Sequence, residues 1–289
     1  MKAPNFTYVR PASLDEALQI LGNRGAGAVP LAGGQSLITT LNMRLSAPEI
    51  LVDIGDLKEL HGIFDDGDVI RIGAATRHTE VLNSPVVSEH LPLLAEAIHH
   101  VGHVAIRNRG TFGGSLAYGD PAAEMPVCAL VQGATMVLAG SAGRRELAAE
   151  DFYRGLYEND LRAGELLIEA RLPKQAPGET AAFAELSRRS GDFAIAGVAA
   201  TGKVENDRLT QLRLAYLGAD NGPKLAAATA AALVGKPLPL TDLAALQSGL
   251  RKDHDMSSVP GLSADTKYHL AQVLTRRVIE TLLGRAGSA

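Results

Sequence analysis

The chain has 289 residues, a formal net charge of −4 and a hydrophobic content of 46%. This length is enough for two modest domains with cores of their own. The slightly acidic balance and the lack of a basic run disfavour nucleic-acid binding. No apolar run reaches the roughly eighteen residues that a transmembrane helix needs, and the first ten residues lack the apolar core of a signal peptide.

Cysteine usage narrows the class of protein further. The single cysteine, Cys128, excludes a disulfide within the chain, which fits a reducing cytoplasm. An iron–sulfur cluster normally takes four thiolates, so any such centre that serves this protein belongs to another polypeptide. Because Cys128 lies in the apolar helical run 126–131, we expect it to pack in a core.

The first 58 residues predict a small α/β unit. Ser13 and Glu16 have the spacing of a capping box, which begins a helix that runs to about Asn23. Apolar or alternating runs on either side of this helix predict strands at residues 6–9, 28–31 and 50–54. A strand, a helix and a further strand in this order are typical of an α/β subdomain.

A second subdomain is expected over residues 59–175. A hairpin-type turn at 65–68 precedes a strand at 69–73. Thr76 is placed to cap a helix that ends at Asn83. The patterns beyond it predict helices at 91–101 and 121–132, strands at 135–138 and 165–172, and a loop or short helix at 156–161. Two prolines and a glycine in 173–180 indicate a domain junction.

The remaining residues, 178–289, predict a separate C-terminal domain. Strand patterns at 182–187, 195–204 and 209–217 indicate three antiparallel strands. Helical patterns follow at 223–234, 242–251 and 263–283. Strands followed by helices are typical of an α+β domain, and α+β is therefore the predicted fold class of the chain.

Two glycine-rich stretches stand out as candidate ligand-binding loops. Residues 109–126 read RGTFGGSLAYGDPAAEMP, and residues 31–37 read LAGGQSL. A Gly-Gly pair allows positive φ and close approach of a ligand to the backbone. Thr111 and Ser115 add hydroxyl groups, and such a donor surface suits phosphate oxygens. Two such loops could hold one diphosphate from two sides, although a single Gly-Gly-x-Ser is more often a surface turn.

The residues give less support to a Rossmann-type nucleotide site, a hydrolase site or a metal site. The dinucleotide fingerprint G-x-G-x-x-G is absent, because Pro30 breaks the pattern that begins at Gly25. The chain has neither a P-loop nor a G-x-S-x-G nucleophile elbow, which disfavours hydrolase chemistry. His99, His100 and His103 lie at helical spacing, but without an H-E-x-x-H pattern we interpret them as helix-surface residues rather than metal ligands.

These motifs carry a resemblance to a known family. AGGQS at 32–36 and TFGGSLAYGDPAAEMP at 111–126 resemble the two flavin-binding signatures of the FAD-binding medium subunit of molybdenum hydroxylases, as in enzymes of the carbon monoxide dehydrogenase and xanthine dehydrogenase type. The N-terminal Phe-x-Tyr strand, the strand ending at Asp53 and the stretch RRSGDF at 188–193 are also similar. The resemblance covers nearly the whole chain and implies a vanillyl-alcohol-oxidase-like FAD-binding domain of two subdomains.

The resemblance also implies which residues contact non-covalent FAD. Glu124 holds the position of a family acid that contacts the cofactor, and Asp120 is a weaker candidate. Phe193 stands where relatives often have Tyr, Gln35 where they often have His, and Phe112 where Ile or Leu is usual. The predicted cofactor-binding residues are Ala32, Gly33, Gly34, Gln35, Ser36, Leu37, Val101, Thr111, Phe112, Gly113, Gly114, Ser115, Asp120, Glu124, Leu161, Leu166 and Phe193.

The implied function is electron relay within an oxidoreductase complex. Electrons from a molybdopterin centre on a large subunit would cross [2Fe–2S] clusters on a small subunit to FAD on this chain, and then pass to NAD or another acceptor. The expected assembly is a heterohexamer, a dimer of three-subunit units. Two alternatives stay open: a stand-alone flavin oxidase of the vanillyl-alcohol type, and a non-redox nucleotide-binding protein.

Overall fold

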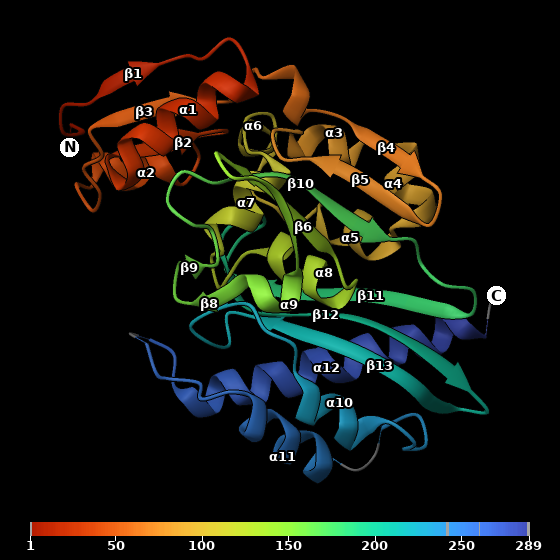
Figure 1. Cartoon of the computed structure of the whole chain (residues 1–289). Helices are drawn as coiled ribbons and strands as arrows, with labels where there is room; N and C mark the ends of the chain where they lie inside the picture. Colours follow the sequence, from red (N-terminus) through yellow and green to blue (C-terminus); the bar gives the residue numbers. More distant parts are fainter. Residues whose placement is uncertain (1, 241–242, 260, 288–289) are drawn as a thin grey trace.

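The computed structural model describes residues 2–240, 243–259 and 261–287, and it begins with a parallel sheet (Figure 1). Strands β1 (Thr7–Val9), β3 (Ile50–Asp53) and β2 (Ala28–Leu31) lie in the order β1-β3-β2, with both pairs parallel. Helix α1 (Leu14–Arg24) links β1 to β2, and α2 (Leu37–Asn42) follows β2. The α/β pattern predicted for the first subdomain is therefore present.

One of the two hydrogen bonds of the capping box predicted for α1 is present. The Ser13 hydroxyl accepts a hydrogen bond from the Glu16 N–H at 3.2 Å, so Ser13 is the N-cap. The Glu16 carboxylate accepts from the Ala12 N–H at 2.7 Å instead of from Ser13. The apolar residues of α1 then face β2 and β3, where Ala17 is fully buried.

A second sheet has five strands, and all of its pairs are antiparallel. Its order is β4-β5-β10-β6-β7, with β4 (Ile63–Asp66), β5 (Val69–Gly73), β10 (Leu166–Pro173), β6 (Thr135–Gly140) and β7 (Gly143–Ala148). The two edge strands, β4 and β7, were not predicted as strands. Both are rich in charged residues because an edge strand is largely exposed to water, so they lack the apolar pattern that marks a strand in a sequence.

Six short helices pack between and beside these sheets. They are α3 (His78–Leu82), α4 (Pro85–His90), α5 (Pro92–Ala97), α6 (Val104–Arg107), α7 (Phe112–Tyr118) and α8 (Glu124–Val131). A further short segment, α9 (Ala149–Phe152), precedes a small hairpin of β8 (Tyr153–Gly155) and β9 (Glu158–Asn159), which replaces the loop or short helix predicted there.

Three helix boundaries differ from the predicted ones. Thr76 does not cap α3, since its hydroxyl is buried and exchanges hydrogen bonds with the backbone of Gly62. The helix predicted at 91–101 ends at Ala97. Helix α8 begins at Glu124 rather than near Pro121, because the Asp120 carboxylate accepts from the Ala122 N–H at 2.8 Å and forms a turn before the helix.

The C-terminal part contains the three antiparallel strands predicted for it. They are β11 (Glu179–Ser187), β12 (Ala194–Glu205) and β13 (Arg208–Leu217), in the order β11-β12-β13. Helices α10 (Ala227–Leu233), α11 (Leu243–Asp253) and α12 (Ala264–Ala286) follow. The predicted first residue of the second of these helices, Asp242, lies outside the described residues. The mixed α+β fold class is confirmed.

The C-terminal sheet is covered on both faces. Ala182, Val198 and Leu214 face helices α10 to α12 in one core. Phe183 and Ala199, on the opposite face, belong to the large core that also contains the apolar residues of α5 and α8. The two halves of the chain are therefore joined by packed side chains, and Figure 1 shows α8 next to β12.

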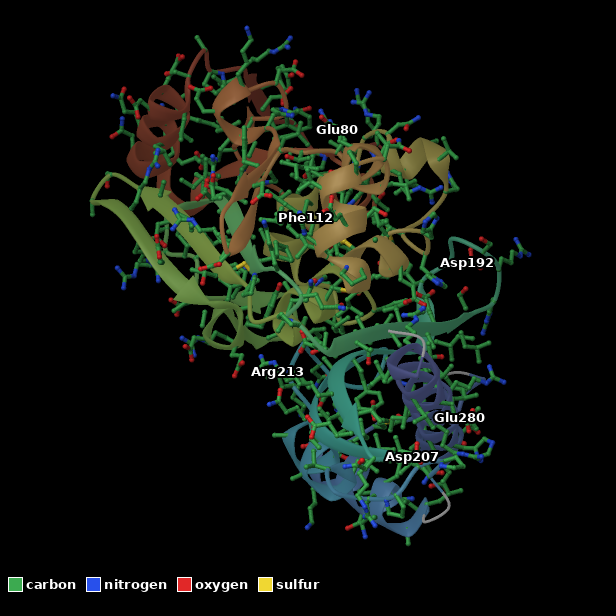
Figure 2. All side chains as sticks on the ribbon, turned by 90° about the vertical axis from the view of Figure 1, so that its right-hand side faces the viewer. Glu80, Phe112, Asp192, Asp207, Arg213 and Glu280 are labelled. Carbon is green, nitrogen blue, oxygen red and sulfur yellow. The ribbon has the colours of Figure 1, made fainter. Side chains whose placement is uncertain are left out.

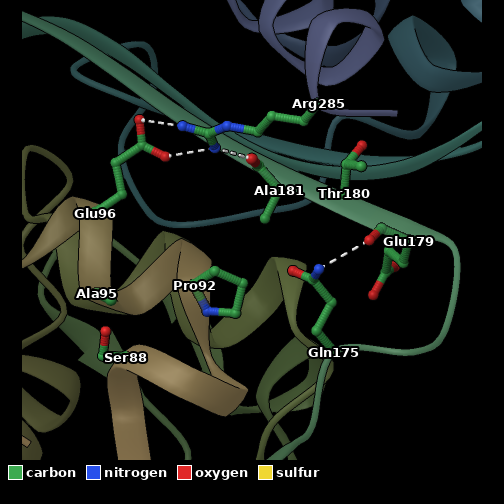
Figure 3. A pocket seen from close by; sticks show the side chains of 9 residues that line it. All are labelled: Ser88, Pro92, Ala95, Glu96, Gln175, Glu179, Thr180, Ala181 and Arg285. Carbon is green, nitrogen blue, oxygen red and sulfur yellow. Dashed lines mark hydrogen bonds and ion pairs between the residues drawn. The ribbon is translucent and has the colours of Figure 1, made fainter. Parts of the chain in front are cut away.

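Two arginines also join the halves. Arg213 of β13 donates to the carbonyls of Leu130 and Val131 at the end of α8, where the halves meet in Figure 2. Arg285 of α12 forms an ion pair with Glu96 of α5 at 2.9 Å beside a cavity of about 460 Å³ (Figure 3).

In the part of the chain that the structure describes, none of the helices has the length and apolar character needed to cross a bilayer.

Candidate functional site

The first glycine stretch forms a tight turn at the carboxyl end of β2. Gly34 has φ +71°, a conformation that glycine adopts without strain. The Gln35 side chain turns back and donates to the Gly33 carbonyl at 2.9 Å. Within the described residues, the backbone N–H groups of Gly33 to Ser36 donate to no protein acceptor. These unused donors form a concave surface that can bind an anion.

The second stretch is not the loop that we predicted. Thr111 is the N-cap of α7, and its hydroxyl accepts from the Gly114 N–H at 3.1 Å. The N–H groups of Phe112 and Gly113 donate to the carbonyls of Thr76 and Ala74. The two glycines therefore have ordinary helical conformations, and the amides at the start of this helix are used within the protein instead of being open to a phosphate.

The fold nevertheless brings the two stretches into contact. A Cβ atom placed on Gly33 would lie 2.7 Å from the Cα atom of Gly110, and it would overlap the carbonyl oxygen of Arg109. A Cβ atom on Gly114 would lie 3.9 Å from the Cβ atom of Ala32. The free amides of the first turn thus lie close to the start of α7, the helix that carries the hydroxyl groups of Thr111 and Ser115.

Arg77 holds this contact together, and the sequence analysis missed it. Its guanidinium group donates to the carbonyl of Arg109 and, at 3.2 Å, to the carbonyl of Gly55 just after β3. Gly55 in turn lies close to the first turn, because a Cβ atom there would be 3.1 Å from the Ala32 carbonyl oxygen. Nothing in the local sequence distinguishes Arg77 from a surface arginine, since its two acceptors come from remote segments.

Several predicted site residues have side chains that point into the core. Phe112 is fully buried, as its position inside the ribbon in Figure 2 indicates, and Leu166 and Val101 are also buried. Gly113 packs directly on the turn after β5, because a Cβ atom there would lie 2.8 Å from the Ala74 carbonyl oxygen. The side chains of these residues are therefore not open to a ligand, and the glycine at 113 is needed for helix packing.

The remaining predicted residues lie in different surroundings, and only Asp120 among them lines a cavity. Asp120 lies in the turn before α8, and the Tyr157 hydroxyl donates to it at 3.4 Å. Both residues line a cavity of about 460 Å³, together with Arg188, which follows β11. Phe193 is 73% exposed, beside the loop that carries Asp192 in Figure 2. Leu161 is half-buried against the large core.

Glu124, the predicted acidic contact, has an unusual electrostatic environment. It is the first residue of α8 and is only 8% exposed. Burial raises the pKa of its carboxyl to about 7, helped by the nearby charge of Asp120 and opposed by a hydrogen bond from its own backbone. A carboxylate so placed is able to accept a hydroxyl hydrogen bond or to hold a proton near neutral pH.

The three histidines do not form a metal site. The imidazole of His100 packs on the Phe183 ring with centroids 5.1 Å apart, and His103 precedes α6. Among the described residues, no group of three or more histidine, cysteine or acidic side chains could hold a metal ion.

Cys128 is fully buried, as expected, and burial raises the pKa of its thiol, so that it stays protonated.

Two family models match most of the chain. Residues 4–175 match the family described as the FAD binding domain in molybdopterin dehydrogenase. Residues 181–282 match the CO dehydrogenase flavoprotein C-terminal domain.

Individual relatives match most of the chain. The nicotine 6-hydroxylase medium subunit of Paenarthrobacter nicotinovorans is 35% identical over 280 residues, 96% of this chain and 98% of that protein. The carbon monoxide dehydrogenase medium chain of Hydrogenophaga pseudoflava is 39% identical over 74% of this chain and 75% of its own length.

Solved structures show the same fold. One of carbon monoxide dehydrogenase from Hydrogenophaga pseudoflava superimposes with a TM-score of 0.94 at 34% identity, covering 99% of both chains. Quinoline 2-oxidoreductase from Pseudomonas putida 86 gives a TM-score of 0.92 at 37% identity, also covering 99% of both chains.

Proposed function

Because the chain belongs to the family of FAD-binding medium subunits of molybdenum hydroxylases, we propose that it relays electrons within such a complex. It takes them from [2Fe–2S] clusters on a small partner subunit and passes them to NAD or another acceptor. A large subunit carries molybdopterin, and two three-subunit units assemble in the cytoplasm. Residues 1–175 form the FAD-binding domain, and residues 178–289 form the C-terminal domain.

The residues of the site fit an FAD diphosphate. The N–H groups of Gly33 to Ser36 have no acceptor among the described residues, and they lie beyond the carboxyl end of a parallel strand, where open sheets commonly bind nucleotides. In this proposal the hydroxyl groups of Ser36 and Ser115 would supply further donors, and the Glu124 carboxylate would accept from a cofactor hydroxyl. This pattern supports phosphate binding by the first turn, with α7 closing the other side.

The relay proposed here requires few catalytic side chains from the protein. A bound flavin accepts and donates electrons by itself, so the protein has to bind it, orient it and set its electrostatic environment. The Tyr157 hydroxyl contacts the Asp120 carboxylate at 3.4 Å, and the relay proposed here requires no catalytic acid or base from this pair. The contact of Gly33 with the Arg109–Gly110 backbone is the observation that carries the proposal, since it makes one site out of two distant segments.

The decisive experiment is the visible spectrum of the purified chain, alone and after co-expression with its genomic neighbours. Acid-releasable FAD, with iron–sulfur absorbance only in the co-purified complex, would support the relay. A protein that takes up no added FAD would contradict the flavin assignment. A flavin-loaded chain that oxidised an organic substrate by itself would point instead to a stand-alone oxidase.

A further inference from the structure

Helix α7 ends in a carbonyl group that the helix itself cannot satisfy. In a continuing α-helix the Ala117 carbonyl would accept from the residue four positions later, but that residue is Pro121, which has no N–H group. The chain leaves the helix at Gly119, which has φ +63°. The side chain of Asn159 supplies the missing donor, because its Nδ2 atom donates to the Ala117 carbonyl at 2.6 Å.

A second hydrogen bond fixes the amide group of Asn159 in this orientation. Its Oδ1 atom accepts from the Leu161 N–H at 2.9 Å, which leaves the Nδ2 atom to face Ala117. Asn159 is half-buried and ends strand β9. The neighbouring contact of this hairpin with α7, between the rings of Tyr157 and Tyr118, involves a tyrosine that is 50% exposed. Asn159 is therefore the main polar link between the hairpin and the last turn of α7.

Arg145 of strand β7 holds the segment that follows Asn159. Its Nη1 atom donates to the Asp160 carboxylate at 2.9 Å, and its Nη2 atom also donates to the Asp160 carbonyl. The same guanidinium group forms a bidentate ion pair, at 2.8 and 2.7 Å, with Glu165 just before β10. Bidentate pairs of this kind are strong and geometrically specific. Arg145 thus fixes both ends of the loop between β9 and β10, next to Asn159.

The opposite end of α7 lies at the candidate diphosphate site. There Thr111 caps the helix, and a Cβ atom on Gly114 would lie 3.9 Å from the Cβ atom of Ala32 in the first glycine stretch. The helix has seven residues and is about 10 Å long, so a shift of its last turn is transmitted to its first turn. The hydroxyl of Ser115, a proposed donor to the ligand, belongs to the same short helix.

We propose that Asn159 is a positioning residue that holds α7 in place for the ligand at its start, and that Arg145 keeps Asn159 in place. The inference rests on the proposed function, because it connects a contact at one end of α7 with the ligand site at the other. Asn159 acts through the Ala117 carbonyl and the helix backbone, and it does not touch the ligand itself.

Amide hydrogen exchange of the flavin-free chain tests the hold on α7. Asn159→Asp keeps the size of the side chain, but it replaces the donor with a carboxylate oxygen that repels the Ala117 carbonyl. We expect the Gly119 N–H, which closes the last turn of α7, to exchange roughly five- to tenfold faster in this variant, the effect of one lost hydrogen bond. Asn206→Asp, the same change at an exposed position between β12 and β13, should leave this rate unchanged.

A second variant separates the lost contact from the added charge. Asn159→Leu has a similar size but neither a donor nor a charge, so the Gly119 N–H should again exchange faster. If both variants exchange like the native chain, Asn159 does not hold α7. If only Asn159→Asp exchanges faster, the added charge is the cause, and the proposal is equally overturned.

The consequence for the ligand is tested by FAD titration under conditions where every variant is fully folded by far-ultraviolet circular dichroism. Both Asn159 variants should raise the dissociation constant of FAD by roughly five- to tenfold and change the visible circular dichroism of the bound flavin at saturation. A purely structural role would lower the urea midpoint of unfolding but leave the affinity and the flavin spectrum as in the native chain. That result would overturn the positioning role.

A double variant tests the part assigned to Arg145. Arg145→Lys loses the planar fork and should weaken FAD binding, whereas Arg144→Lys, at the exposed preceding position of β7, should not. If Arg145 acts through Asn159, the combination of Arg145→Lys with Asn159→Asp should bind FAD no more weakly than Asn159→Asp alone. Losses that simply add would show that Arg145 acts by another route.

Failure of this inference and failure of the proposed function give different results. A native chain that takes up no FAD contradicts the proposed function and removes the ligand from the inference, while the exchange rates still decide whether Asn159 holds α7. A native chain that binds FAD no more tightly than the two Asn159 variants overturns the positioning role and leaves the proposed function intact.

Discussion

Gly33 and Gly110 lie so close that a Cβ atom on Gly33 would be 2.7 Å from the Cα atom of Gly110. The two residues belong to separate subdomains, one after β2 and the other just before α7. Their contact positions the free amides of the first turn beside the start of α7. A site for a diphosphate therefore depends on two backbones that approach each other without side chains between them.

Gly33→Ala should weaken both folding and FAD binding. The added methyl group would meet backbone atoms that have no room to move aside, and such overpacking costs about 1–3 kcal/mol. Urea unfolding and FAD titration of the purified chain measure the two effects. Gly22→Ala, on α1 with ordinary contacts only, is the matched control and should leave both unchanged or slightly improved. An alanine at 33 that binds FAD normally would show that the two segments do not need this contact.

Arg77→Lys should lower FAD affinity by more than it lowers stability. Lysine keeps the positive charge but lacks the planar fork that bonds two carbonyl groups at once, so Arg109 and Gly55 are no longer held together. Loss of a hydrogen bond to a charged group costs about 1.5–3 kcal/mol. FAD titration beside urea unfolding separates the two quantities. Arg10→Lys serves as control, because its pair with Asp56 is largely exposed.

Thr111→Val should destabilise the chain by about 1 kcal/mol, because it removes the hydroxyl that caps α7 while keeping the shape of the side chain. Thr111→Ser keeps the hydroxyl and should retain most of the stability. Urea unfolding of the three proteins measures the difference. A larger loss for serine than for valine would show that the buried methyl group of Thr111 matters more than the cap.

His78 should make the chain sensitive to acid. Burial lowers the pKa of its imidazole to about 4, and Nδ1 has no partner. A base with a lowered folded pKa binds protons more readily when unfolded, so its contribution to stability is complete above pH 6.5 and is lost as the pH falls toward 4. His78→Leu should lose less stability over this interval than the native chain. The exposed His269→Leu is the control, and identical acid curves for His78→Leu and the native chain would contradict the prediction.

Much of the secondary structure follows from local pattern. The alternation of apolar residues in 182–217 predicts three long strands, and β11, β12 and β13 are found there. The Ser13 cap is equally local, since a hydroxyl at that position needs only the next three residues. By contrast, the Gly-Gly pair at 113–114 predicts a loop but lies in α7. Packing against Ala74, a residue far away in the sequence, outweighs the poor helix propensity of glycine.

Short-range patterns and recognisable motifs are enough to predict the class of protein, the two glycine stretches and the three antiparallel strands of the C-terminal sheet. Which N–H groups remain free for a ligand depends on how the chain packs, because the amides of α7 have acceptors only where Ala74 and Thr76 lie next to them. The tertiary structure also brings the Arg77 guanidinium group to the two carbonyl groups that accept its hydrogen bonds. It also buried the Glu185 side chain with its Oε2 atom 3.9 Å from Nδ1 of His100. Such long-range contacts depend on how the chain packs, and packing leaves no periodic trace in the sequence.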